Sequence, residues 1–288
     1  MTAPAAGIRK ATKRLLLGGV NTVARAMGRA PWGGGAHILT YHQVRASRAE
    51  VIDAYNEVAL DRLEEHLAAL GEAGLEMITV SELWARLQAG GDPHRLVALT
   101  FDDGLVEHLD LVVPALQRAG AVATFYLPSG CLGRPASEVG YAGHHLDAAE
   151  VRRLRAEGME IGSHSRSHAV LARLDAAALA AEISGSRRDL EEILGQAPRS
   201  FSYPYGSRRT FDARVSAAVR SAGFETAVST IPGTNLAGTP PYALRRLAVY
   251  QGDDARLVVA KARGALDWTG SLQELWLRAF PHHSVRPL

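Results

Sequence analysis

The sequence has almost no cysteine and no long hydrophobic run. Cys131 is the single cysteine among 288 residues, so no intramolecular disulfide can form. Without a CxxC context, it is interpreted as a small apolar residue of the interior. No segment approaches the ~20 apolar residues needed to span a bilayer. The apolar segment 15–20 is shorter than a usual signal-peptide core and precedes no clear cleavage site. We therefore expect a retained N-terminus and a cytoplasmic or peripheral-membrane location.

The chain also lacks a strong net charge, which is only +2. Its distribution is uneven, because the first 48 residues carry eight arginine or lysine residues and no acidic one. The other 240 residues therefore carry 24 basic and 30 acidic groups. This balance argues against nucleic acid as a partner of the main body, since such binding needs a basic surface.

Residues 8–28 combine basic residues with apolar residues at three- and four-residue steps, which predicts an amphipathic helix. One interpretation is peripheral contact with an anionic membrane surface. The other is a helix packed on the main domain, or a frayed arm. A glycine-rich linker follows, so we expect three parts: an N-terminal helix and linker (1–35), a catalytic domain (36–270) and a C-terminal tail (271–288).

Strand-like and helix-like segments alternate along the central part. The predicted strands are 37–40, 77–80, 97–100, 121–127, 159–162, 201–203, 226–228 and 247–250. Predicted helices lie between them, including 60–74, 147–155, 174–194, 211–222 and one near 254–266. This alternation predicts an α/β fold with a parallel sheet, either open or closed into a barrel.

Two adjacent carboxylates, Asp102 and Asp103, follow the strand predicted at 97–100 within the segment Thr100–Gly104. Carboxylates at the end of a buried strand are costly to desolvate unless something pairs with them. The presence of both carboxylates would be explained if one of them bound a metal ion and the other acted as a general base.

The strand predicted at 159–162 is followed by a turn that carries His164 and His168. Two histidines four residues apart are weak evidence alone, but ligands in parallel α/β folds lie at the carboxyl ends of strands. One aspartate with two histidines leaves coordination positions open for water and substrate, which is typical of catalytic metals.

A third strand ends in the turn 202–206, which contains Pro204 and Gly206. Such a turn is able to present the backbone N–H of Tyr205 to a developing oxyanion. Taken alone, it is equally an ordinary turn at the end of a strand.

These motifs resemble those of the polysaccharide deacetylase family, also called the NodB homology domain or carbohydrate esterase family 4. The family's Thr-Phe-Asp-Asp-Gly motif is matched at 100–104, its His-Ser/Thr-x-x-His motif at 164–168, and its Arg-x-Pro-Phe/Tyr turn, in modified form, at 202–205. Segments 39–42 and 123–126 are also similar, and the resemblance covers roughly 36–250.

The resemblance implies a deformed (β/α) barrel of about seven parallel strands and metal-dependent removal of N- or O-acetyl groups from sugars. By position, Asp103, His164 and His168 would hold Zn²⁺ or another divalent ion such as Co²⁺ or Ni²⁺. Asp102 would be the general base.

Two positions depart from the family pattern. Ser202 stands where the family usually has an arginine that orients or tunes the base, and Arg245 or Arg246 is a candidate to supply the charge. The late histidine that acts as general acid is missing, since no histidine lies between 169 and 281. His42 is a candidate replacement, as are His282 and His283 or water on the metal. The alternative interpretation of His42 is a hydrogen-bonded structural histidine.

The sequence therefore predicts a metal-dependent deacetylase acting on an N-acetylated (or O-acetylated) sugar in a polysaccharide or lipid-linked glycan. Deformylation of a lipid-linked aminosugar is an alternative, and so is a non-catalytic carbohydrate-binding barrel. Asp253 and Asp254 form a second acidic pair, which we interpret as a helix cap or solvated turn. Tyr141 is a candidate sugar contact.

Overall fold

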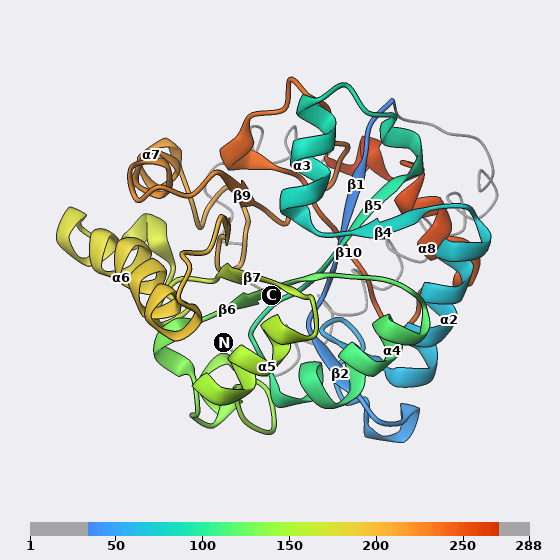
Figure 1. Ribbon diagram of the computed structural model, residues 1–288, viewed down its shortest axis with the longest axis horizontal. Coiled ribbons are helices and arrows are strands. Elements are labelled where there is room, and N and C mark those ends of the chain that lie inside the picture. The colour runs from blue at the N-terminus through green and yellow to red at the C-terminus, as the bar shows by residue number, and fades with distance from the viewer. Residues whose placement is uncertain (1–33, 271–288) are drawn as a thin grey trace, which may run out of the picture.

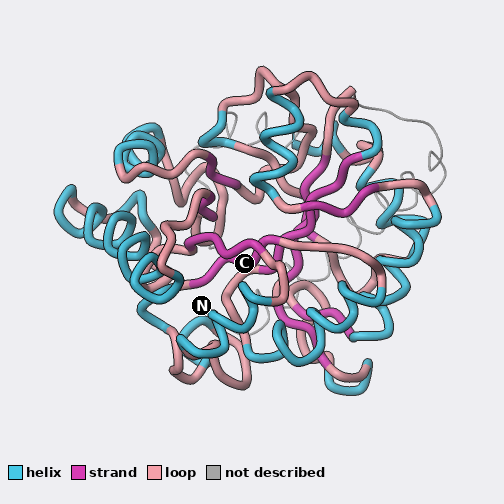
Figure 2. Tube along the Cα trace, in the orientation of Figure 1, coloured by secondary structure: helices cyan, strands magenta, loops and turns pink. Residues whose placement is uncertain are grey.

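The computed structural model describes residues 34–270. The helix predicted at 8–28 and the candidate histidines His282 and His283 lie outside the described residues. Strands occupy the middle of the described part and helices lie around them (Figures 1 and 2). None of the helices in this part is both long and apolar enough to cross a membrane.

A curled parallel sheet forms the centre of the fold. Its strands follow one another in the order β10-β1-β5-β6-β7-β8-β9, and every neighbouring pair is parallel. In that order the strands are β10 (Leu247–Ala248), β1 (His37–Tyr41), β5 (Leu96–Phe101), β6 (Thr124–Leu127), β7 (Glu160–Ser163), β8 (Ser200–Ser202) and β9 (Thr226–Val228). A parallel bridge between Val228 and Leu244 links β9 to the segment before β10. The strands thus form the deformed barrel that the sequence predicts.

Three further strands lie outside this order. The short strand β4 (Glu76–Ile78) pairs with the first half of β5, while β6 pairs with the last two residues of β5. A separate two-stranded parallel sheet is made by β2 (Gln43–Arg45) and β3 (Glu57–Ala59), just beyond the end of β1.

The helices begin and end at residues with recognisable capping chemistry. They are α2 (Leu60–Glu72), α3 (Val80–Gln88), α4 (Val113–Arg118), α5 (Ala148–Ala156), α6 (Ala176–Leu194), α7 (Ala213–Ser221) and α8 (Ala255–Ala262). Asp147 caps α5 in a capping box with Glu150, and Asp175 caps α6. Gly195 ends α6 with a φ of 69°, a left-handed conformation that glycine adopts without strain. The bounds of α5 and α6 lie within two residues of the predicted ranges 147–155 and 174–194.

Some local predictions were wrong. The strands predicted at 121–127 and 247–250 are shorter in the structure, at Thr124–Leu127 and Leu247–Ala248. The strand predicted at 77–80 ends at Ile78, opposite Ala98 of β5, and the Thr79 hydroxyl accepts a hydrogen bond from Glu82 N–H to start α3. Asp254 caps α8, but Asp253 is not in a solvated turn. Its side chain is fully buried and pairs with Lys261.

The strands are buried on both faces, as is usual for a parallel sheet covered by helices. All six residues of β5 are buried. The Phe101 ring stacks between Tyr41 and Phe125, with ring centroids 5.1 Å apart in each pair. Burying each such side chain contributes about 1.5–3 kcal/mol. The carboxyl ends of neighbouring strands are therefore fixed, and His42, Asp102 and His164 come directly after three of them.

Candidate active site

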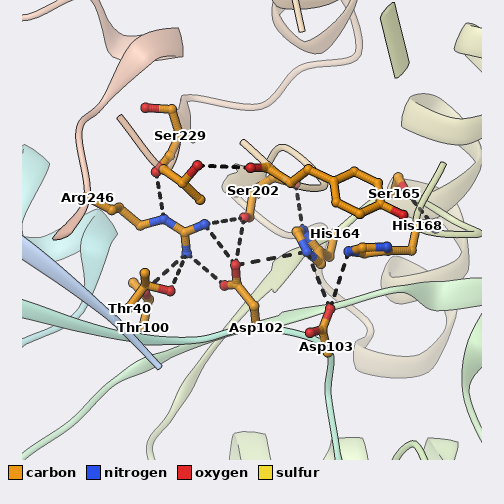
Figure 3. A network of polar contacts seen from close by, with 12 residues as sticks. Thr40, Thr100, Asp102, Asp103, His164, Ser165, His168, Ser202, Ser229 and Arg246 are labelled. Carbon is orange, nitrogen blue, oxygen red and sulfur yellow. Dashed lines mark hydrogen bonds and ion pairs between the residues drawn. The ribbon is translucent and has the colours of Figure 1, made fainter. Parts of the chain in front are cut away.

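Three side chains predicted as metal ligands lie together in the structure. Asp103 follows β5, and His164 and His168 follow β7. The Nε2 atoms of both histidines are 3.5 Å from Oδ1 of Asp103. One ligand atom from each residue lies within 4.8 Å of the other two (Figure 3). The chain thus brings one carboxylate oxygen and two imidazole nitrogens to a single point.

The orientation of these side chains suits a divalent cation. Nδ1 of His164 is 2.8 Å from the Ser202 carbonyl oxygen, so it carries the proton and leaves the Nε2 lone pair facing the cluster. Oδ1 of Asp103 is buried and has no hydrogen-bond partner among the described residues. Because an ionised buried oxygen without a partner is costly, a bound cation would satisfy it. The donor set fits Zn²⁺ or a similar ion.

The protonation states agree with this fit. Burial, partly offset by the charge of Asp102, lowers the pKa of His164 to about 4, so its imidazole is neutral at pH 7. Burial raises the pKa of Asp103, but His168 and His164 outweigh it and the net shift is downward. A neutral imidazole beside an ionised carboxylate is the form in which these groups bind metal.

Backbone strain is concentrated around the same point. Four non-glycine residues in the described part have a positive φ: Asp103 at 75°, Ser165 at 63°, His168 at 58° and Tyr205 at 62°. Each such conformation costs on the order of 1–3 kcal/mol and persists only where the surroundings enforce it. Two of them are candidate ligands, one lies between the two histidines, and the fourth is the residue proposed to face the oxyanion.

Asp102 lies beside this cluster, but Arg246 binds it. The Arg246 guanidinium donates to Oδ1 of Asp102 at 2.7 Å and to Oδ2 at 2.8 Å, and both side chains are buried. Oδ2 also lies 3.9 Å from Nε2 of His164, on the side facing the cluster. Burial alone would raise the pKa of Asp102; the charge of Arg246, together with His164, holds that pKa well below its usual range instead.

Every donor group of Arg246 has an acceptor. Nε donates to the Ser229 carbonyl oxygen at 2.9 Å. Nη1 also donates to the Thr40 and Thr100 hydroxyls, which are cross-strand neighbours on β1 and β5. Nη2 also donates to the Ser202 hydroxyl at 2.9 Å. The guanidinium is therefore held by groups on β1, β5 and β8 and by the residue that follows β9 (Figure 3).

The structure distinguishes the two candidate arginines. The Arg245 side chain donates to the Pro232 carbonyl oxygen, away from Asp102, whereas Arg246 reaches the carboxylate. Ser202, at the position where a family arginine was expected, both contacts Arg246 and lies 3.4 Å from Oδ2 of Asp102. The short serine leaves this space to a guanidinium that comes from the segment before β10.

The remaining predicted residues lie around the cluster. His42 is half-buried between β1 and β2, and its charge acts on both Asp102 and Asp103. The ring of Tyr205 packs edge-on against His168, with centroids 4.7 Å apart. His108, on a π-helical turn (His108–Val112) after β5, donates to the His42 carbonyl oxygen at 2.8 Å.

Tyr141, a candidate sugar contact from sequence, and His145 both contact Asp103, which the sequence does not predict. The Tyr141 hydroxyl hydrogen-bonds the Asp103 carboxylate, and burial together with the nearby Asp103 charge raises the pKa of Tyr141. Nδ1 of His145 donates to the Asp103 carbonyl oxygen at 2.7 Å. Both residues belong to a loop without a recognisable motif, so their contacts with Asp103 have no local sequence signal.

Comparison with known proteins agrees with the fold and the motifs. Residues 89–227 match the family model described as polysaccharide deacetylase. The Bacillus subtilis protein YxkH is 25% identical over 216 residues, covering 75% of this chain and 71% of that protein. A chitin deacetylase of Pestalotiopsis sp is 38% identical over 110 residues, but these make up only 34% of its length and 38% of this chain.

Solved structures support the same architecture. The Streptococcus pyogenes deacetylase PplD in complex with acetate has a TM-score of 0.69 at 21% identity, covering 79% of this chain and 98% of that one. IcaB from Ammonifex degensii has a TM-score of 0.66 at 23% identity, with 80% and 98% covered. At these identities the likeness concerns the fold. The matching family model identifies residues 89–227 as a polysaccharide deacetylase region, and the deacetylase relatives indicate a hydrolase that acts on carbon–nitrogen bonds.

Proposed function

We propose that this chain is a divalent-cation-dependent deacetylase that hydrolyses the N-acetyl group of a sugar in a polysaccharide or lipid-linked glycan. The observation that carries the proposal is the partnerless Oδ1 of Asp103, held 3.5 Å from two imidazole nitrogens, with the carboxylate of Asp102 beside it. The Asp103 carboxylate is placed to bind a cation, while the Asp102 carboxylate is paired with Arg246. The two neighbouring aspartates would thus have different roles in the reaction.

Asp103, His164 and His168 would hold the cation. When bound, such a cation lowers the pKa of a water molecule and polarises the acyl carbonyl group. Asp102 would accept the proton of the attacking water through Oδ2, the oxygen that faces His164. A carboxylate oxygen has two lone pairs; Oδ2 accepts a short bond from Arg246 at 2.8 Å and a long one from the Ser202 hydroxyl at 3.4 Å, and the attacking water would replace the long one. Arg246 also fixes the plane of the carboxylate, which keeps the base oriented.

Two further groups complete the reaction. The backbone N–H of Tyr205 would donate to the oxyanion as the tetrahedral intermediate forms. The positive φ of Tyr205 supports this assignment, because strained backbone at a site usually serves binding or catalysis. His42 would give a proton to the leaving amine, since it lies at the end of β1 within electrostatic reach of both aspartates.

The exposure of the site is compatible with a glycan substrate. His168 and the Tyr205 ring form its accessible side, and Tyr205 is 38% exposed. An exposed aromatic ring beside the reacting centre is suited to pack against a sugar ring. Relatives are named for acetylated glycans, namely chitin and peptidoglycan N-acetylmuramic acid. Contact of residues 8–28 with a membrane surface stays a prediction.

Acyl release from a panel of sugars tests the proposal. Chelator-treated protein is incubated with N-acetylglucosamine oligomers, an O-acetylated glycan and an N-formylated aminosugar, with and without Zn²⁺ or Co²⁺. We expect acetate release that depends on the added cation and is abolished in Asp102→Asn. Formate release alone would favour the deformylase, and cation binding without turnover of any substrate would favour a carbohydrate-binding barrel.

A further inference from the structure

The loop that follows β7 carries both candidate histidine ligands in a conformation that needs external support. Between His164 and His168, Ser165 has a positive φ, as does His168 itself. Residues with a Cβ rarely adopt this conformation. His164 is fixed independently, because its N–H donates to the Leu127 carbonyl oxygen and its ring to that of Ser202. The placement of His168 depends on the loop.

One face of helix α6 supports this loop. Glu182, Ser186 and Asp189 are spaced by four and three residues, so they lie on the same side of the helix. Oε2 of Glu182 accepts from the backbone N–H groups of Arg166 and Ser167, both at 2.9 Å. Oε1 of Glu182 accepts from the Ser167 hydroxyl at 2.6 Å. A single carboxylate thus binds two successive amides in the middle of the loop.

Arg166 fastens the loop to the same face. Its guanidinium donates to Asp189 at 2.8 and 3.3 Å. Its side chain crosses α6 at Gly185, where an added Cβ would lie 2.8 Å from Cδ of Arg166. Asp189 also accepts from the Ser129 hydroxyl at 2.6 Å, and the Gly130 N–H donates to the Arg166 carbonyl oxygen. The close approach explains why a glycine stands inside a long helix.

We propose that Glu182 and Asp189 are positioning residues for the cation site, acting through the loop 164–168. They hold the backbone in the strained conformation that brings Nε2 of His168 to the Asp103 carboxylate. Without Glu182, the Arg166 and Ser167 amides lose their acceptor and the loop relaxes toward an unstrained backbone. His168 then leaves the cluster, and Asp103 and His164 remain as a two-residue site. The inference rests on the proposed function for the identity of the ligands.

Variants of Glu182 separate this role from general stability. Glu182→Ala removes both acceptor oxygens. Glu182→Gln keeps one oxygen for the two amides and an NH₂ group toward Ser167. Glu192→Ala, an exposed position on the same helix, is the matched control. Gly185→Ala is a second disruptive variant, which displaces Arg166 without removing a charge.

Two measurements follow. Amide hydrogen exchange of residues 165–168 is recorded in the metal-free proteins, and Co²⁺ binding is titrated by calorimetry and visible absorption. We expect exchange at least about tenfold faster in Glu182→Ala and a Co²⁺ Kd weakened by about 10–100-fold, the usual effect of losing a partner behind a metal ligand. Gly185→Ala should change both in the same direction, while Glu182→Gln and Glu192→Ala should stay near wild type.

The outcomes distinguish this inference from the proposed function. If wild-type protein binds no Co²⁺, the proposed function fails and the positioning role fails with it. If wild type binds Co²⁺, but Glu182→Ala and Gly185→Ala exchange and bind Co²⁺ as wild type does, only the positioning role is overturned. Equal loss in Glu182→Ala and Glu192→Ala would also overturn it, because the effect would then reflect the helix and not the loop.

Discussion

Two neighbouring aspartates differ at the residue scale because their surroundings differ. Asp103 turns a partnerless oxygen toward two imidazoles, whereas Asp102 is paired through both oxygens with Arg246. In both, burial raises the pKa and nearby cationic groups outweigh it. Only Asp102 owes the largest part of this effect to a permanently charged arginine, so its ionisation depends less on the protonation of a histidine.

Replacing Arg246 should change the pH dependence of activity. In Arg246→Met, burial would act on Asp102 without the guanidinium charge, so the pKa of Asp102 should rise. We expect the acid limb of the kcat/KM profile to move to higher pH and the rate at pH 7 to fall by about tenfold or more, the scale of an impaired general base. Cation content should remain that of wild type.

Arg245→Met is the matched control, because its side chain reaches the Pro232 carbonyl oxygen instead of Asp102. It should leave the pH profile unchanged. An unaltered acid limb in Arg246→Met would show that the arginine does not tune the base.

The proposed acid role of His42 predicts a change at the other end of the profile. A general acid must be protonated, so loss of its proton should cause the basic limb of kcat/KM. In His42→Ala we expect this limb to disappear and the rate below it to fall by about 10²-fold. A wild-type profile in His42→Ala would assign His42 a structural role only.

The lowered pKa of His164 predicts acid sensitivity of the metal-free protein. The pKa is about 4 in the folded state and about 6.5 in an unfolded chain. Between these values the unfolded chain binds more protons, so the free energy of unfolding should fall as pH decreases from 6.5 to 4. Urea unfolding of chelator-treated wild type and His164→Asn checks this. Equal losses of stability over this range in both proteins would contradict it.

At the scale of single elements, β10 has its own anchor. Nζ of Lys261 in α8 donates to the Ala248 carbonyl oxygen of β10 at 2.8 Å and also pairs with Asp253. Both charged side chains are almost completely buried. Because Arg246 directly precedes β10, this pair helps to fix the strand from which the guanidinium reaches Asp102.

Breaking that pair should be costly. Lys261→Met leaves the Asp253 carboxylate buried without its cation, and we expect a loss of about 3–5 kcal/mol in the free energy of unfolding. The double variant Lys261→Met/Asp253→Asn should recover part of the loss, since no lone charge remains. Urea denaturation measures both. A double variant as unstable as the single one would indicate that packing, and not charge, sets the cost.

At the scale of the whole molecule, local features were predictable from sequence and the long-range pairing was not. The strand ends at Asp102 and His164, and the caps at Asp147 and Asp175, depend on neighbours within a few residues. The Arg246–Asp102 pair joins residues 144 positions apart, and it depends on how the barrel curls after β9. Sequence therefore left Arg245 and Arg246 open, and it could not place Tyr141 against Asp103.

Equilibrium binding of Co²⁺ to chelator-treated wild type, Asp102→Asn and Asp103→Asn determines which of the two aspartates holds the cation. We expect one Co²⁺ per chain in wild type and in Asp102→Asn, and a binding affinity reduced by at least about tenfold in Asp103→Asn. Loss of binding in Asp102→Asn with retention in Asp103→Asn, or no binding by wild type, would contradict it.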